Sequence, residues 1–128
     1  MIGYVTLGTN DFARACAFYD ALLAEIGIPR LMSFPRGQAW GHSMAQPSLA
    51  GMLPFDEQPA SPGNGVMVAI PVLEPAQVQR VYDRAIALGA QDEGAPGPRG
   101  NSGFYAAYFR DLDGNKLNVF CMAAAAAG

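Results

Sequence analysis

The sequence repeats one succession of chain elements, and this repeat limits the possible folds more than any other feature. In each half, a β-prone stretch containing Tyr4 or Met67 is followed 14 residues later by an apolar residue and a tyrosine, and then by a glycine that can end a helix. The two halves are offset by 63 residues. We therefore expect two copies of a strand–helix–strand–strand–strand module. Each copy has one helix to cover one face of its sheet, so the other faces can enclose a cleft for a ligand.

The first half shows the change of period clearly. Residues 1–8 are rich in β-forming residues that alternate between two faces, which is typical of a strand. From 11 to 26 the apolar residues follow helical spacing, and Gly27 can end this helix in a left-handed conformation. Short apolar stretches separated by proline and glycine then predict an antiparallel meander at about 29–34, 38–44 and 48–53.

The second half follows a linker at 54–63, which contains three prolines and no periodic pattern. We expect a strand at 65–72 and then a helix at 74–88 that Gly89 ends. The remaining elements are expected to be a short strand near 90–94, a glycine-rich loop at 94–103, and strands at 103–111 and 115–122.

Length and composition agree with one globular domain. The chain has 128 residues, of which 51% are hydrophobic and 15% charged, and this is enough to bury a single core. We place the domain at residues 1–122, with modules at 1–53 and 64–122 and a tail at 123–128. The expected fold class is α+β, with two βαβββ modules forming an open sheet cleft.

Charge and cysteine content narrow the possible partners. The formal net charge is −3 and the basic residues are scattered, so we expect no nucleic-acid binding. Cys16 and Cys121 are far apart and belong to no CxxC pair, which argues against a zinc knuckle or a disulfide framework. No apolar run approaches the roughly 18 residues of a membrane span, and the start lacks a signal-peptide pattern. These features favour a soluble protein of the cytoplasm.

The acidic stretch DLDGN, residues 111–115, has two possible interpretations. A calcium loop of the EF-hand type needs glycine at its sixth position and glutamate at its twelfth. Counted from Asp111, Gly114 comes fourth and the twelfth residue is Met122, so the calcium interpretation fails. Asp, Gly and Asn adopt the conformations that join antiparallel strands, and this stretch is therefore expected to be a hairpin turn.

Three longer stretches occur in an order and at a spacing that suggest a family. They are MIGYVTLGTNDFARACAFYDALL at the start, GNGVMVAI at the start of the second half, and YFRDLDGNKLNVF near the end. Together they resemble the vicinal oxygen chelate superfamily, which includes glyoxalase I, extradiol dioxygenases, and fosfomycin-resistance and bleomycin-resistance proteins. The resemblance implies the fold above, a small-molecule ligand and a homodimer. It implies no single reaction, because this fold hosts unrelated chemistries and metal-free binders.

The resemblance also implies where a divalent metal would bind. Enzymes of this family usually hold it with a histidine in the first strand of each module and a glutamate in the last strand. This chain has Tyr4, Met67 and Asn118 at those positions, and residues 37–55 contain no acid to supply a fourth ligand. A neutral phenol, a soft thioether and a neutral amide are poor ligands for such a cation. We expect no cofactor, with a divalent metal as the alternative.

Two polar residues are candidates for ligand contacts. His42 is the single histidine of the chain; it can be a general base or displaced metal ligand, or simply a residue on the rim of the cleft. Arg99 lies in the glycine-rich stretch at 94–103, which can be a flap whose arginine meets an anionic group or a plain solvated loop. Both pairs of alternatives stay open at this point.

Aromatic residues on the predicted strands are the remaining candidates. Trp40, Phe104, Tyr105 and Tyr108 can form a wall for an apolar or planar ligand, or can be core residues, because alternation alone does not say which strand face looks inward. Cys16 falls on the apolar face of the first helix and is expected to pack there.

These observations lead to a hypothesis about function. We expect a metal-free small-molecule binding protein; the alternative is a lyase, isomerase or dioxygenase of the same superfamily with a non-standard site that uses His42 and Tyr4. Sequestration of bleomycin is a narrower option, and the charge of −3 favours that cationic drug only weakly. The expected ligand-binding residues are Tyr4, Trp40, His42, Met67, Arg99, Tyr105 and Asn118.

Overall fold

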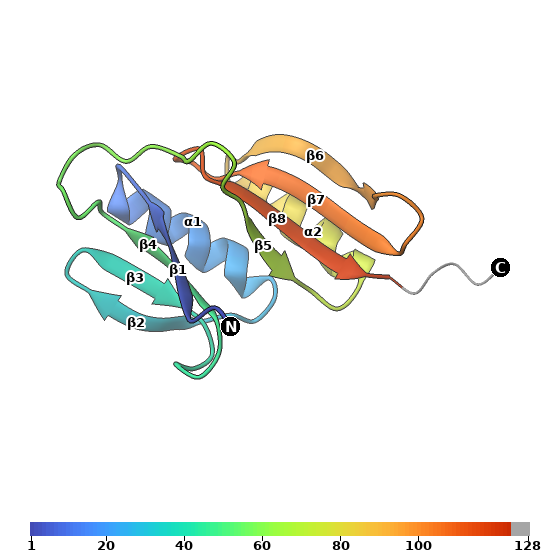
Figure 1. Cartoon of the computed structure of the whole chain (residues 1–128), viewed down its shortest axis with the longest axis horizontal. Coiled ribbons are helices and arrows are strands. Elements are labelled where there is room, and N and C mark those ends of the chain that lie inside the picture. Colours follow the sequence, from blue (N-terminus) through green and yellow to red (C-terminus); the bar gives the residue numbers. More distant parts are fainter. Residues whose placement is uncertain (124–128) are drawn as a thin grey trace.

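The computed structural model describes residues 1–123, which form two helices and eight strands. Figure 1 shows two sheets side by side, with the helices on one side of the molecule. The elements of the first module are β1 (Tyr4–Gly8), α1 (Phe12–Ala24), β2 (Arg30–Phe34), β3 (Gly37–Trp40) and β4 (Ser48–Met52). Those of the second are β5 (Val68–Pro71), α2 (Pro75–Ala87), β6 (Gln91–Pro98), β7 (Phe104–Arg110) and β8 (Lys116–Met122). The predicted α+β class with two βαβββ modules is confirmed.

Each module folds into a four-stranded mixed sheet with the same topology. The strand orders are β1-β4-β3-β2 and β5-β8-β7-β6, and the first strand of each module pairs in parallel with the last. The other pairs are antiparallel. The edge strands β1 and β5 therefore occupy equivalent places in the two sheets.

The two helices cover their sheets because their apolar faces are continuous. The side chain of Asp11 accepts a hydrogen bond from the backbone N–H of Arg14 and so caps the start of α1. Gly27 and Gly89 follow the helices with positive φ angles of 70° and 101°, as the sequence predicts. One core joins both modules, and its fully or nearly fully buried residues include Phe18, Leu22, Leu23, Val78, Val81, Phe109, Leu117 and Val119.

The DLDGN stretch forms the turn between β7 and β8, as expected, and it also joins the two modules. The carboxylate of Asp111 accepts hydrogen bonds from the backbone N–H groups of Asp113 and Asn115 and from the Asn115 amide. It also accepts one from the hydroxyl of Tyr19 on α1. Asn115 in turn donates to the carbonyl oxygen of Gly8 at 2.9 Å. The carboxylate in this turn therefore accepts hydrogen bonds from donors in both modules.

Strand β6 is longer than the sequence predicts. The expected short strand near 90–94 extends to Pro98, so the expected loop at 94–103 is reduced to residues 99–103. Two of the four glycines of the expected loop, Gly94 and Gly97, lie instead at register shifts opposite β7, and Gly100 and Gly103 lie in the remaining loop. An edge strand tolerates such irregularities and proline, because only one of its sides needs regular pairing.

Strand β3 is shorter than expected, and this changes the place of His42. The predicted strand at 38–44 ends at Trp40, so His42 lies in the bend that follows. The backbone N–H of Gly41 donates to the carbonyl of Pro29, the residue before β2, and the pairing of β3 with β4 ends at Trp40. Strand β5 is also shorter than the expected 65–72 and leaves Met67 just before its first residue.

Two further observations complete the fold. Residues 53–67, which include the predicted linker, contain neither helix nor strand. Neither helix in the described residues is long and apolar enough to span a membrane.

Candidate ligand-binding groove

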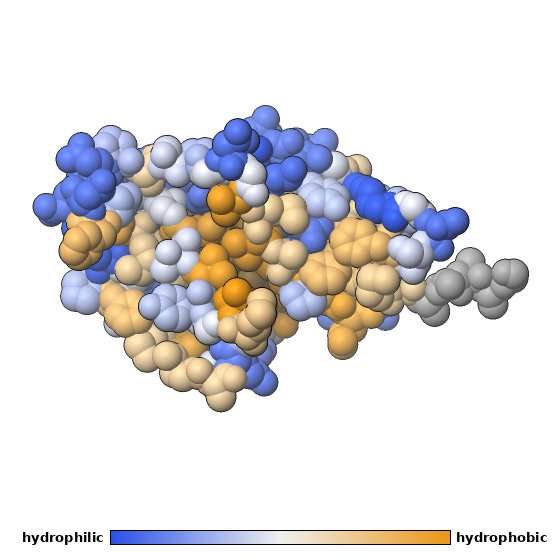
Figure 2. Space-filling model, viewed as in Figure 1, coloured by the Kyte–Doolittle hydropathy of each residue, from blue (hydrophilic) through white to orange (hydrophobic). Residues whose placement is uncertain are grey.

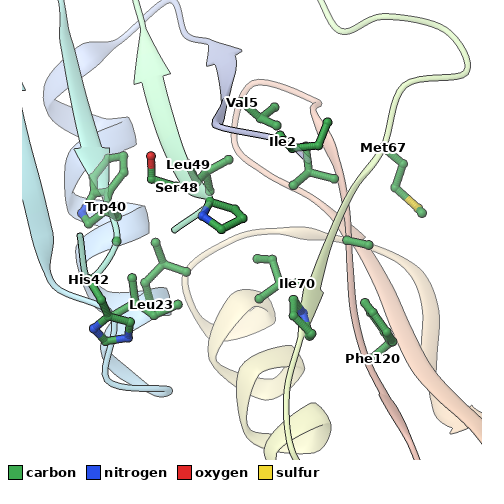
Figure 3. Close-up of a pocket in the computed structure, with 16 residues that line it drawn as sticks. Ile2, Val5, Leu23, Trp40, His42, Ser48, Leu49, Met67, Ile70 and Phe120 are labelled. Carbon is green, nitrogen blue, oxygen red and sulfur yellow. The ribbon is translucent and has the colours of Figure 1, made fainter. Parts of the chain in front are cut away.

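An apolar groove of about 600 Å³ lies between the two modules. Figure 3 shows Trp40, His42 and Leu23 on one side of it and Ile70, Met67 and Phe120 on the other. Both edge strands contribute, through Val5 of β1 and residues 68–71 of β5. The volume falls within the range typical of sites for small molecules. The complete lining is Ile2, Val5, Leu23, Ile28, Trp40, Gly41, His42, Pro47, Ser48, Leu49, Met67, Val68, Ala69, Ile70, Pro71 and Phe120.

Trp40 forms a rigid part of the first wall. Its indole Nε1–H donates a hydrogen bond of 2.8 Å to Asp20, which satisfies the one polar atom of the ring. Asp20 is also held by Arg30, and hydrogen bonding from this guanidinium lowers the pKa of the Asp20 carboxyl. The aspartate is thereby kept as an anion that accepts from the indole. The ring is 1% exposed and packs beside Tyr19, with 5.3 Å between the ring centroids, so Trp40 forms part of the floor of the groove.

The second wall comes from β5 and β8. Val68 and Ile70 pack against the core, whereas Ala69 and Pro71 alternate with them and are exposed. Phe120 of β8 lies opposite Pro71 in the register and stacks at 5.5 Å, between ring centroids, on Phe104 of β7. The wall is thus hydrophobic over its whole length.

Few polar side-chain atoms face this groove. Apart from the indole nitrogen already bonded to Asp20, the lining offers the imidazole of His42 and the hydroxyl of Ser48. His42 is exposed in the bend after β3, and Ser48 begins β4. A ligand can therefore be mostly apolar and still be oriented by one or two polar contacts on this side.

The three positions at which the family carries metal ligands do not form a metal site here. Tyr4 is 66% exposed and is not part of the groove lining, whereas Met67 lines it. Asn118 is 1% exposed, and its amide donates to the carbonyl of Ala107 at 3.2 Å. Within residues 1–123 no three His, Cys, Asp or Glu side chains are grouped to hold a metal ion. The donor set does not fit a divalent cation, because it lacks both imidazole and carboxylate.

Arg99 is placed over the sheet rather than on a free flap. Its guanidinium donates to the carbonyls of Gly97 and Ala95, each at 2.8 Å, and lies 5.4 Å from the ring centroid of Tyr108. These contacts hold Arg99 against the face of its sheet that the helices do not cover.

The four aromatic residues of the expected wall are not brought together. Trp40 lines the groove, but Tyr105 packs against the helix-covered core. Phe104 and Tyr108 alternate with Tyr105 along β7 and therefore lie on the opposite face. The strand alternation separates residues that are close in sequence. Cys16 packs in the core as expected, and burial raises the pKa of its thiol.

The groove lining includes several residues that were not predicted from the sequence. Phe120 could have been found, because it lies two residues after Asn118 and so on the same strand face. Leu23, Ile28 and Ile70 carry no local signal that separates groove lining from ordinary core.

Comparison with known proteins identifies the family. Residues 1–119 match the model of the glyoxalase/bleomycin resistance protein/dioxygenase superfamily. The chain belongs to this superfamily. The predicted resemblance is therefore confirmed over nearly the whole chain, and comparison with curated proteins gives no match.

Solved structures of the glyoxalase superfamily have the same fold. A glyoxalase/bleomycin resistance protein from Albidiferax ferrireducens T118 is 31% identical, with a TM-score of 0.87 over 94% of this chain and 98% of that one. A glyoxalase/bleomycin resistance protein/dioxygenase family enzyme from Burkholderia phytofirmans PsJN is 18% identical, with a TM-score of 0.73 over 94% and 97%. The fosfomycin resistance protein FosX from Listeria monocytogenes is 17% identical, with a TM-score of 0.69 over 94% and 92%. The last two show the shared fold alone.

Proposed function

We propose that this chain is a metal-free small-molecule binding protein of the glyoxalase superfamily. The observation that carries the proposal is the apolar groove between the modules, combined with the internally bonded Asn118 amide where related enzymes carry a metal-binding glutamate. The ligand is mostly apolar, because the groove offers few polar side-chain atoms. His42, Met67 and Phe120 contact it, above a groove floor to which the buried ring of Trp40 contributes.

We also propose that the protein forms a homodimer and is located in the cytoplasm. Figure 2 shows apolar side chains gathered over the centre of the face in view, between hydrophilic ends. Exposed apolar residues outside the groove lining include Tyr4, Phe34 and Met122, and a partner subunit would cover such a surface. Two buried free thiols, Cys16 and Cys121, suit a reducing compartment. Light scattering during size-exclusion chromatography measures the oligomeric state.

An apolar fluorescent probe tests the groove. N-phenylnaphthylamine is neutral and emits strongly in apolar surroundings, and Trp40, the single tryptophan of the chain, is positioned to transfer energy to it. We expect saturable binding with quenching of the Trp40 emission. Ala69→Phe places a ring on the exposed groove side of β5 and should weaken binding at least about 10-fold, whereas Ala76→Phe, on the exposed surface of α2, should not. Absence of saturable binding, or equal binding by both variants, would refute the proposal.

The second candidate function is a lyase, isomerase or dioxygenase of the same superfamily. The observation that favours it is the exposed imidazole of His42 on the groove rim, where it can exchange a proton with a bound molecule. The expected partner Tyr4 does not line the groove, so this version relies on His42 alone. His42→Ala should abolish turnover in such an enzyme but should reduce binding of the neutral probe by less than about 3-fold. A turnover screen in which His42→Ala and the parent protein behave alike removes this candidate.

A further inference from the structure

The uncovered face of the second sheet carries positive charge in a chain whose formal net charge is −3. Arg110 and Lys116 are paired across β7 and β8, and Arg99 lies over β6 beside them. One acid, Glu93, forms an ion pair with Arg110. The neighbouring Asp92 is engaged by the hydroxyl of Tyr82 on α2 and by the backbone of Gly94. This corner therefore has more cations than anions.

Two of these cations lie close to the aromatic ring of Tyr108. The guanidinium carbon of Arg99 lies 5.4 Å from the ring centroid, and the ammonium of Lys116 lies 5.6 Å from it. Tyr108 stands on β7, whereas Lys116 belongs to β8 on one side and Arg99 covers Gly94 of β6 on the other. The ring thus lies near one cation from β8 and one from the residue that follows β6, and its electron-rich face attracts such cations.

Lys116 is the cation that is available to a ligand. Arg99 is fixed by two backbone carbonyls, and Arg110 by Glu93 and the carbonyl of Gly114. The ammonium of Lys116 makes no ion pair or side-chain hydrogen bond with any residue in the described part of the chain. An anion beside the ammonium of Lys116 would also be attracted by the positive charge of Arg99 near the same ring.

This corner adjoins the groove. Val68 is the first paired residue of β5 and lies opposite Leu117, so Met67, which immediately precedes β5, and Lys116, which begins β8, lie at the same end of this strand pair. Met67 lines the groove. A molecule in the groove can therefore extend past Met67 and bring a charged end to Lys116.

We propose that the ligand of the groove is an amphipathic anion. Its apolar body lies between the modules, and a single carboxylate or sulfonate pairs with Lys116 beside Tyr108, while Arg99 adds favourable charge. This inference rests on the proposed binding function and deepens it by naming the ligand class. The same corner repels cationic ligands, and a cationic drug such as bleomycin is therefore disfavoured.

A pair of probes that differ in one charged group tests the proposal. Anilinonaphthalene sulfonate has the fused and phenyl rings of N-phenylnaphthylamine and adds one sulfonate. We expect the anionic probe to bind at least about 10-fold more tightly at about 20 mM salt, and this advantage to shrink at about 500 mM. Lys116→Gln should remove most of the advantage and leave the neutral probe within about 2-fold. Arg80→Gln removes a charge from the exposed face of α2 and should change neither affinity. Ala69→Phe should weaken both probes.

The possible results distinguish a failure of the anion inference from a failure of the proposed binding function. Equal affinity of the two probes, or an equal loss of both in Lys116→Gln, overturns the anion inference while the groove remains supported. An equal effect of Arg80→Gln on the anionic probe also overturns it, because the attraction would then come from overall charge. If Ala69→Phe weakens the neutral probe but not the anionic one, the anion binds elsewhere and the inference fails. Absence of any binding of the neutral probe refutes the groove itself. Circular dichroism of each variant confirms that it is folded.

Discussion

The hydroxyl of Tyr19 donates a 2.5 Å hydrogen bond to Oδ2 of Asp111, and this buried contact joins helix α1 of the first module to the β7–β8 turn of the second. The carboxylate of Asp111 accepts three further hydrogen bonds from within its own turn. Nearby, Arg14 donates to the carbonyl of Leu112, and the backbone of Asn10 donates to Asp113. These bonds position one module against the other, and the groove lies between the modules.

Tyr19→Phe should destabilise the fold through this contact. The change keeps the ring in the core but leaves a buried carboxylate one donor short, which costs about 1–3 kcal/mol in the free energy of unfolding. Tyr82→Phe is the matched control, because the hydroxyl of Tyr82 donates to Asp92 at the surface, and its loss should cost less than about 0.5 kcal/mol. Urea denaturation measures both values. Equal costs would contradict the role given to Tyr19.

Stability should fall steeply at alkaline pH. Burial, with the negative charge of Asp111 beside the hydroxyl, raises the pKa of Tyr19 well above its ordinary value of 10. Above about pH 10 the hydroxyl of Tyr19 loses its proton in the unfolded chain but keeps it in the folded chain. The contribution of Tyr19 to the free energy of unfolding is therefore complete below about pH 10 and is lost as the pH rises toward the pKa of the folded state. The slope contributed by one such group approaches about 1.4 kcal/mol per pH unit. Tyr19→Phe should flatten the dependence in urea denaturation at increasing pH; an unchanged slope would contradict the assignment.

Gly114→Ala should weaken the same turn by a different mechanism. Gly114 has a φ of +86°, a conformation that costs an L-residue about 1–2 kcal/mol, and an added Cβ would lie 3.3 Å from Cγ of Pro62. Gly3→Ala is the control, because nothing lies within 4 Å of an added Cβ there. Thermal unfolding should show a lower midpoint for the first variant alone. Similar midpoints would mean that the turn relaxes without strain.

Divalent metals should leave the protein unchanged. Tyr4, Met67 and Asn118 lack the imidazole and carboxylate groups that such ions need, so added Zn²⁺, Ni²⁺, Mn²⁺ or Fe²⁺ should produce no saturable heat in calorimetric titration. The chelator EDTA should leave the thermal midpoint within about 1 °C, because a ligand that binds only the folded state would otherwise stabilise it. Elemental analysis of the purified protein provides an independent measurement. Stoichiometric tight binding of any of these ions would contradict the metal-free proposal.

Local sequence patterns were sufficient to predict both helices and the turn between the last two strands. The helices at 12–24 and 75–87, their terminal glycines and the DLDGN turn follow from apolar periodicity and backbone preferences, which act over a few residues. The repeat then implied two equivalent modules, and the structure confirms them. The errors fell where local signals conflict with pairing, as in the bulged and glycine-rich β6.

The site depended on contacts that no local pattern encodes. Alternation along β7 separates Tyr105 from Phe104, but only sheet packing shows which of them faces the core. The groove joins Leu23 to Phe120, and the cation corner joins Arg99 to Lys116 through Tyr108. Leu23 and Phe120 are distant in the chain, whereas Arg99, Tyr108 and Lys116 belong to one module; both groups meet because the sheets set the faces and registers of their residues. The chemistry of each residue and the order of the helices and strands therefore follow from the sequence alone. Which side chains contact one another depends on the tertiary structure, because burial and strand register are properties of the whole fold.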